Sequence, residues 1–213
     1  MVTENFMKAF IYTGGEIFPN NITEHPKADD LTIAADSGYS NAKTLGDSVQ
    51  ILVGDLDSLD RSKIEGRPEL IEVPAEKDFT DTQLAVETAL KRGADDIVII
   101  GGLSGRLDHT LSNLAILKDL SDRGVYAVMA DGKNRVRYIK STSTLIARSG
   151  YTYLSLIADG EKVKGVSIEG CKYPLENAVL NDRYQYAVSN EIVGNCALIS
   201  VKKGGLYIVE SAD

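Results

Sequence analysis

Short apolar segments alternate with helical patterns as far as Asp131, and beyond it the chain carries only short β-prone segments. In the first part, six apolar runs have the length and composition of strands: residues 8–13, 31–35, 51–53, 70–73, 97–100 and 125–130. Strands that alternate with helices predict βαβ units and a mainly parallel sheet, whose ligands bind beyond the carboxyl ends of the strands.

Two helices have clear boundaries in the sequence. The first begins at Thr80, because Thr80 and Gln83 have the spacing of a capping box, and it stops before Gly93. The second begins near Asp108 and closes at Gly124. Both helices follow a predicted strand or the loop after it, which supports the alternating pattern.

The second part has the spacing of an all-β domain. Its β-prone segments are separated by Gly, Asn and Asp at intervals of about 8–12 residues, which is typical of a sandwich or barrel; they are residues 135–139, 144–147, 151–157, 163–169, 184–189, 196–201 and 206–210. We therefore expect two domains: a Rossmann-like mainly parallel α/β domain over residues 1–132, and an all-β sandwich over residues 133–213.

Charge is distributed unevenly between the two parts. The whole chain has a net charge of −8, but residues 1–130 carry 12 Lys and Arg against 22 Asp and Glu, a net of −10, and the rest carries +2. This balance argues against broad binding to nucleic acid or to an anionic membrane. Two cysteines without metal-ligand spacing, no apolar run of membrane-spanning length and no leader-like N-terminus predict a cytoplasmic protein.

The first of three acidic clusters is Gly-Asp-Leu-Asp-Ser at 54–58, directly after a predicted strand. Asp55 and Asp57 are separated by one residue, so both carboxylates can turn toward one hard cation. An Asp-rich turn with local hydrogen bonds is the alternative.

The second cluster, Glu-Lys-Asp-Phe-Thr-Asp at 76–81, leads into the helix that begins at Thr80. Acidic residues there can cap the free amides and complement the helix dipole. A helix N-terminus with a nearby Lys is also a place where phosphate binds, so both interpretations stay open.

The third cluster covers residues 101–109, a loop with three glycines that runs into a helix. Glycine lets backbone amides approach phosphate oxygens, and Arg106 can contact such oxygens in a bidentate manner. The loop is neither a Walker A motif nor a dinucleotide fingerprint, and a tight strand-to-helix turn is the alternative. We expect His109 to be a structural imidazole rather than a general base.

Parallel strands end at one edge of a sheet, so the three clusters should converge there. Their five carboxylates are Asp55, Asp57, Asp78, Asp81 and Asp108. Such a group would be mutually repulsive without a divalent metal, and a purely oxygen donor set favours Mg²⁺ over Zn²⁺. The sequence therefore predicts a metal-dependent phosphoryl-transfer site without a P-loop.

These motifs, in this order, resemble the thiamine pyrophosphokinase family. The resemblance rests on Ala-Asp-Ser-Gly at 35–38, Gly-Asp-Leu-Asp-Ser at 54–58, Lys-Asp-Phe-Thr-Asp at 77–81 and Gly-Arg-Leu-Asp-His-Thr at 105–110, with Gly-Cys-Lys-Tyr-Pro-Leu at 170–175 and Ser-Asn-Glu at 189–191 in the second part. It covers nearly the whole chain. It implies an ATP-binding α/β domain, a thiamine-binding β-sandwich, a homodimer, and transfer of a diphosphoryl group from ATP to thiamine, with AMP as the second product.

The resemblance also implies roles for individual residues. Asp55, Asp57 and Asp81 resemble the carboxylates that organise Mg²⁺ and phosphate, and Asp78 and Asp108 resemble further site acids, one of which accepts the hydroxyl proton. The nucleotide contacts would be Asp36, Lys77, Thr80, Ser104, Gly105 and Arg106, with Asp36 near the nucleotide or the thiamine. Ser189 and Asn190 resemble thiamine contacts.

The chain departs from the family at several positions. Glu76, Leu56 and Ser104 stand where Asp, Phe and Gly are common, and there is no Trp to stack on thiamine, a role that a Tyr would have to take. Two alternatives to the kinase are a non-catalytic nucleotide- or thiamine-binding module of the same fold, and a family enzyme that acts on a different alcohol.

Overall fold

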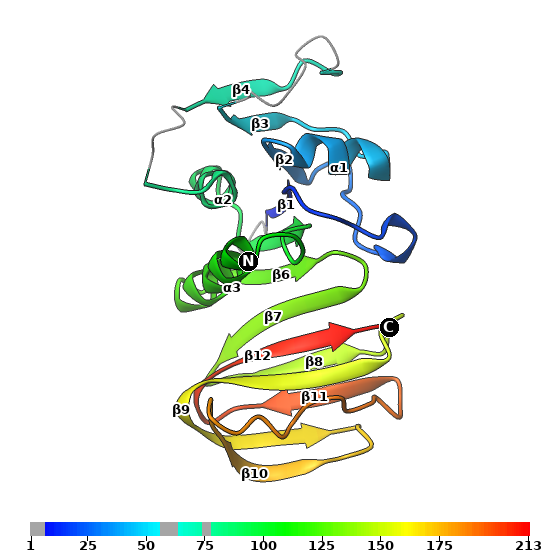
Figure 1. The fold of residues 1–213 in the computed structure, drawn as a ribbon, viewed down its shortest axis with the longest axis vertical. Coiled ribbons are helices and arrows are strands. Elements are labelled where there is room, and N and C mark those ends of the chain that lie inside the picture. The colour runs from blue at the N-terminus through cyan, green and yellow to red at the C-terminus, as the bar shows by residue number, and fades with distance from the viewer. Residues whose placement is uncertain (1–6, 56–63, 74–77) are drawn as a thin grey trace, which may run out of the picture. The chain divides into compact units, whose positions relative to one another are not determined.

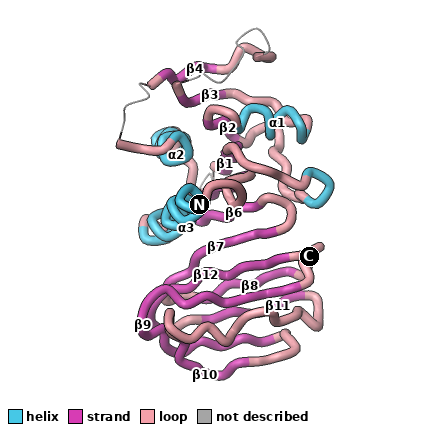
Figure 2. Tube along the Cα trace, viewed as in Figure 1, coloured by secondary structure: helices cyan, strands magenta, loops and turns pink. Residues whose placement is uncertain are grey.

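A computed structural model describes residues 7–55, 64–73 and 78–213. The chain divides into two compact units, Met1–Gly132 and Lys133–Asp213. Parallel and antiparallel strands are both present, with helices confined to the first unit (Figures 1 and 2). No helix in the described ranges has the length and apolar composition needed to span a membrane.

The first unit is built on a parallel sheet with the strand order β4-β3-β2-β1-β5-β6. Its strands are β1 (Lys8–Tyr12), β2 (Leu31–Ala35), β3 (Ile51–Gly54), β4 (Glu69–Glu72), β5 (Asp96–Ile100) and β6 (Tyr126–Ala130). These bounds lie within one residue of the expected strands. Chain connections leave β1 toward β2 on one side and enter β5 on the other, so the strand order reverses between β1 and β5.

Helices cover both faces of this sheet. Helix α1 (Gly38–Leu45) lies on one side of the strands, and α2 (Asp81–Lys91) and α3 (Leu107–Asp122) lie on the other (Figure 1). The central strands β1, β2 and β5 are mostly apolar and buried, as a sheet covered on both faces requires. Phe10 and Tyr12 belong to the core cluster under α1. A 3₁₀ turn, η1 (Pro19–Asn21), lies between β1 and β2.

The predicted boundaries of α2 and α3 agree with the structure. Thr80 caps α2 with both hydrogen bonds of the capping box, and Gly93 and Gly124 follow the two helices with positive φ. Helix α1 has no comparable signal: Ser37 provides no side-chain cap, and no acidic residue lies in its first turn. No local sequence pattern therefore predicted this helix.

The second unit is antiparallel, with strand order β7-β12-β9-β11-β8 and with β10 paired to β9. The strands are β7 (Asn134–Lys140), β8 (Ser143–Ala147), β9 (Tyr153–Glu169), β10 (Leu175–Leu180), β11 (Cys196–Ser200) and β12 (Lys203–Ser211). The first half of β9 pairs with β12, and its second half pairs with β10 and β11. Residues from both halves share one core cluster.

Three details of this unit differ from the expectation. The predicted strands 151–157 and 163–169 are one strand, because β9 continues through Gly160, whose φ of +116° lets the chain bend without stopping. Residues 184–189 form no strand: they contact β9 through single bonds, such as Leu156 N–H to Ala187 O at 2.7 Å. Strand β10 was not predicted because Glu176 and Asn177 interrupt its apolar residues, and three of its six residues are exposed.

Candidate functional site

A cavity of about 390 Å³ lies at the carboxyl edge of the parallel sheet. Its walls come from four places: the loop after β1, the turn after β2, the start of α2, and the loop from β5 into α3. The switch in strand order between β1 and β5 opens the crevice there, which is where open α/β sheets bind their ligands.

Six predicted site residues line this cavity. They are Asp36, Thr80, Asp81, Ser104, Gly105 and Arg106. They come from three separate segments of the sequence that the parallel sheet brings together, and of the five predicted carboxylates Asp81 is the one described at the wall of this cavity. His109 also lines the cavity and is exposed, and its N–H donates to Asp108 Oδ1 at 3.0 Å.

Asp36 occupies a constrained position at the end of β2. Its φ is +45°, an uncommon value for a residue other than glycine, and its N–H donates to Val53 O at 2.8 Å. A β-carbon on Gly54 would lie 3.3 Å from the Cβ of Asp36. The end of β3, which leads directly into Asp55, therefore packs against Asp36.

Arg106 and Asp108 hold one another across the start of α3. Arg106 Nε donates to Asp108 Oδ1 at 3.1 Å and Arg106 Nη2 to Asp108 Oδ2 at 2.5 Å. This hydrogen bonding lowers the pKa of Asp108 below its ordinary value, with a smaller contribution from the His109 N–H. Both side chains are exposed, so the guanidinium can exchange the carboxylate for a phosphate group.

The other predicted acids lie at the same edge or outside the described residues. Asp55 directly follows β3 and is half-buried, and Asp78 is exposed two residues before Thr80. Neither is among the lining residues of the cavity. Asp57 and Lys77 fall outside the described ranges, and within those ranges no group of three His, Cys, Asp or Glu side chains is placed to hold a metal ion.

Sequence reasoning missed the loop after β1. Thr13, Gly14 and Gly15 line the cavity at the central strand of the sheet. A β-carbon on Gly14 would lie 2.6 Å from Ser37 Oγ, so a side chain there would require the Ser37 hydroxyl group to move. The two adjacent glycines directly after an apolar strand were the signal that was overlooked.

Ser104 ties the loop before α3 to the loop after β1. Its Oγ accepts the Glu16 N–H at 2.7 Å and donates to Glu16 O at 3.2 Å. Asn113, a buried residue on α3, donates from Nδ2 to Gly102 O at 3.0 Å. Thr82 Oγ1 donates to Thr13 Oγ1 at 3.2 Å between two buried side chains. These contacts fix the walls of the cavity relative to one another.

The two predicted thiamine contacts lie in the second unit and differ in accessibility. Ser189 is exposed with a φ of +55°, and its N–H donates to Ser155 Oγ at 2.9 Å. Asn190 is 4% exposed: its Oδ1 accepts the N–H groups of Tyr173 and Glu191, and its Nδ2 donates to Tyr173 O at 2.7 Å. The two motifs of this unit are therefore bonded to each other.

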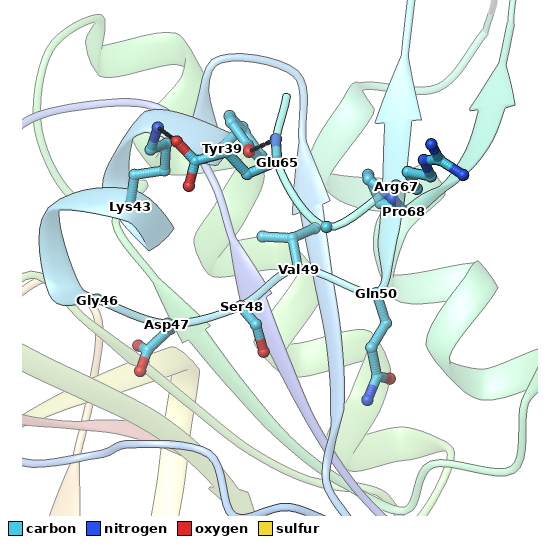
Figure 3. Close-up of a pocket in the computed structure, with 11 residues that line it drawn as sticks. Tyr39, Lys43, Gly46, Asp47, Ser48, Val49, Gln50, Glu65, Arg67 and Pro68 are labelled. Atoms are coloured by element: carbon cyan, nitrogen blue, oxygen red, sulfur yellow. Dashed lines mark hydrogen bonds and ion pairs between the residues drawn. The ribbon is translucent and has the colours of Figure 1, made fainter. Parts of the chain in front are cut away.

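A second pocket of about 720 Å³ lies at the opposite edge of the parallel sheet, beside the amino ends of β3 and β4. In Figure 3 its walls carry Lys43 paired with Glu65, and Tyr39 Oη accepts the Glu65 N–H at 2.7 Å. None of the predicted site residues lines it.

Comparison with known proteins matches both units to described domains. Residues 23–129 match the family model "Thiamin pyrophosphokinase, catalytic domain", and residues 142–206 match "Thiamin pyrophosphokinase, vitamin B1 binding domain". A thiamine pyrophosphokinase of Bacillus subtilis is 29% identical over 198 residues, which cover 91% of this chain and 92% of that protein.

Solved structures of thiamine pyrophosphokinase family proteins are also similar to this chain. The Bacillus subtilis thiamine pyrophosphokinase superposes with a TM-score of 0.86 at 26% identity, and covers 97% of this chain and 99% of its own. A thiamin pyrophosphokinase family protein from Enterococcus faecalis gives a TM-score of 0.82 at 30% identity over the same shares of the two chains.

Proposed function

The chain belongs to the thiamine pyrophosphokinase family, and we propose that it performs the reaction of that enzyme at the cavity on the carboxyl edge of the parallel sheet. In this reaction a diphosphoryl group passes from ATP to the hydroxyl group of thiamine, giving thiamine diphosphate and AMP. The observation that carries the proposal is the meeting of six predicted residues from three distant motifs around one cavity. A purely binding module would not need acids such as Asp36 and Asp81, which line this cavity, beside a polyphosphate.

We propose a division of roles between the two units. The first unit is the Rossmann-like catalytic domain that binds ATP through Asp36, Lys77, Thr80, Ser104, Gly105 and Arg106. The second unit is a β-sandwich that contributes Ser189 and Asn190 to the binding of thiamine. The match of the second unit to a vitamin B1 binding domain supports this division.

Mg²⁺ is the metal that the donor set fits. Asp55, Asp57 and Asp81 would hold it, since carboxylate oxygens are its preferred protein ligands and it usually keeps phosphate and water as the others. Asp55 directly follows β3, and Asp81 opens α2. When bound, the ion offsets the negative charge of the polyphosphate.

The protein residues position the reactants and balance charge. The thiamine hydroxyl oxygen attacks the β-phosphorus in line, the new O–P bond forms, and the bond from the β-phosphorus to the bridging oxygen of AMP breaks. One of Asp55, Asp57, Asp78, Asp81 and Asp108 accepts the hydroxyl proton. Arg106 contacts phosphate oxygens, because its guanidinium is exposed at the cavity. Little covalent work is required of the protein in such transfers.

The direct test is an incubation of the purified protein with ATP, Mg²⁺ and thiamine, followed by chromatography of nucleotides and thiamine species. We expect thiamine diphosphate and AMP in equal amounts, and only when Mg²⁺ is present. ADP as the product would mean transfer of a single phosphoryl group and a different enzyme. Thermal stabilisation by thiamine without turnover would favour the binding module, and turnover with another alcohol would change the substrate.

We also propose that the protein is a homodimer in the cytoplasm. The family resemblance supports the dimer, and two free cysteines, one of them exposed, suit a reducing compartment. Light scattering on the eluting peak of a sizing column measures the molar mass, which should be twice the 23.0 kDa of the chain. A mass of one chain that still has full activity would overturn the dimer.

A further inference from the structure

The carbonyl groups of the loop formed by residues 13–15 all accept hydrogen bonds from protein donors. Thr13 O and Gly15 O both accept from Asn41 Nδ2, at 2.8 and 3.0 Å. Gly14 O accepts the Gly102 N–H at 3.1 Å. A loop whose carbonyl oxygens are engaged in this way presents little negative charge to the cavity that it lines.

The backbone N–H groups of Gly14 and Gly15, unlike the carbonyl groups, are not hydrogen bonded to any residue that the structure describes. Within the described ranges, no hydrogen bond is recorded for the N–H of Gly14 or of Gly15, although Thr13 N–H donates to Ile100 O at 2.9 Å. Gly14 is half-buried, Gly15 is exposed, and both line the cavity. Two successive open amides make a concave surface that favours an anion.

Asn41 produces this arrangement without lining the cavity itself. It lies on α1, and the two hydrogens of its carboxamide serve the two carbonyls of the loop. A β-carbon on Gly101 would lie 3.4 Å from Asn41 Nδ2, so the side chain also fills the space below the glycine loop after β5.

We propose that Asn41 is a positioning residue for the nucleotide polyphosphate: it holds the 13–15 loop with its carbonyls engaged and the N–H groups of Gly14 and Gly15 open to phosphate oxygens. The proposal rests on the proposed function, because it assigns the loop to the ATP that the reaction consumes. Thiamine carries a cationic ring and has no use for an amide cradle, so the effect is specific to the nucleotide.

The test compares Asn41→Asp and Asn41→Ala with the wild type and with Asn20→Asp, which adds the same charge on the exposed surface of the same unit. Asn41→Asp replaces the donor with an anion that repels both carbonyls. Two quantities should rise: the KM for Mg·ATP, and the Kd of the protein for inorganic tripolyphosphate measured in the presence of Mg²⁺. We expect each to rise about tenfold in Asn41→Asp and about fivefold in Asn41→Ala. The KM for thiamine should stay within about twofold in both.

Different results would overturn the role of Asn41 and the proposed kinase activity. Folded Asn41 variants that bind tripolyphosphate and ATP as the wild type does would overturn the inference. A matching rise in the KM for thiamine would mean general damage to the fold and would also overturn it. A wild type that binds tripolyphosphate in a manner sensitive to Asn41, yet forms no thiamine diphosphate, would overturn the proposed function alone. A wild type that binds neither nucleotide nor tripolyphosphate would overturn both.

Discussion

Arg106 and Asp108 show how one residue pair can set the charge state of a site before any substrate arrives. The guanidinium lowers the pKa of the Asp108 carboxyl, so this carboxylate remains ionised as the pH falls through the ordinary Asp value of about 4. A carboxylate held in this way is a weak base, and its negative charge is available over the whole neutral range.

The pH dependence of turnover should therefore not report on Asp108. We expect Asp108→Asn to lower kcat but to leave the midpoint of the acid limb unchanged, because a group with a lowered pKa is already ionised at the pH where that limb lies. Rate–pH profiles of the wild type and the variant measure this. An acid limb that disappears in Asp108→Asn would identify Asp108 as the titrating base.

Substitutions of the neighbouring residues Ser189 and Asn190 should have different effects, one on thiamine binding and the other on stability. Asn190→Ala removes the buried carboxamide that pairs with the Tyr173 backbone N–H and C=O, two part-buried hydrogen bonds, so it should lower the free energy of unfolding by about 2 kcal/mol. Ser189→Ala should leave stability unchanged and raise the KM for thiamine, because the Ser189 side chain is exposed. Denaturation followed by circular dichroism, together with kinetics, separates the two effects. An Asn190→Ala protein as stable as the wild type would contradict a stabilising role for the hydrogen bonds between Asn190 and the Tyr173 backbone.

The two cysteines should differ in reactivity. Cys171 is buried and its burial raises the pKa of its thiol, whereas Cys196 is exposed. Because the thiolate is the reactive form, a disulfide reagent at mildly alkaline pH should label Cys196 quickly and Cys171 only after unfolding. The raised pKa also means that stability falls as the pH rises above the ordinary thiol value, where the unfolded state ionises first. Rapid labelling of both thiols in the native protein would contradict the burial of Cys171.

At the scale of elements, α1 depends on a glycine at its first residue. A β-carbon on Gly38 would lie 2.1 Å from Tyr12 O, a backbone atom of the central strand that cannot move aside. Gly38→Ala should therefore cost about 3 kcal/mol or more of unfolding free energy and displace the wall that contains Asp36. Thermal unfolding and the KM for ATP measure the two effects.

Gly46→Ala is the matched control for this substitution. Gly46 ends the same helix with a φ of +77° and has open space around its Cβ position, so the change should cost only about 1 kcal/mol. Equal losses in the two variants would contradict a collision between the side chain at position 38 and Tyr12 O, because only Gly46 has a positive φ.

The elements that could be predicted from sequence are those with local signals. The Thr80–Gln83 capping box predicts helix α2, and apolar runs predict the buried strands of the first unit. Helix α1 begins without a side-chain cap, and β10 pairs with β9 although Glu176 and Asn177 interrupt its apolar residues, so tertiary contacts decide both. Among the candidate site residues, the acids and Arg106 could be proposed from their chemistry. The 13–15 loop acts through its backbone, and Asn41 through that backbone, so neither has a side-chain signature at the cavity.

At the scale of the whole molecule, charge should influence the two substrates in opposite directions. The first 130 residues carry a net charge of −10, which attracts the thiazolium cation of thiamine and repels Mg·ATP. Raising the salt concentration toward about 1 M shortens the screening length to about 3 Å, so we expect the KM for thiamine to rise severalfold and the KM for Mg·ATP not to rise. Kinetics in potassium chloride and in tetramethylammonium chloride distinguish screening from specific ion binding. Parallel changes in both KM values would show that the net charge plays no part.

The order of strands in the second unit also has a consequence for how the protein is made. Strand β12 lies between β7 and β9, and it pairs Ser211 with Asn134. Strands β7 and β9 are therefore synthesised before the strand that lies between them. The parallel sheet of the first unit, in contrast, is complete once β6 has been synthesised. Contacts so distant in sequence form slowly, and domains fold as units during synthesis. The first unit is thus able to fold while the ribosome is still translating the second, and the second closes only when β12 emerges.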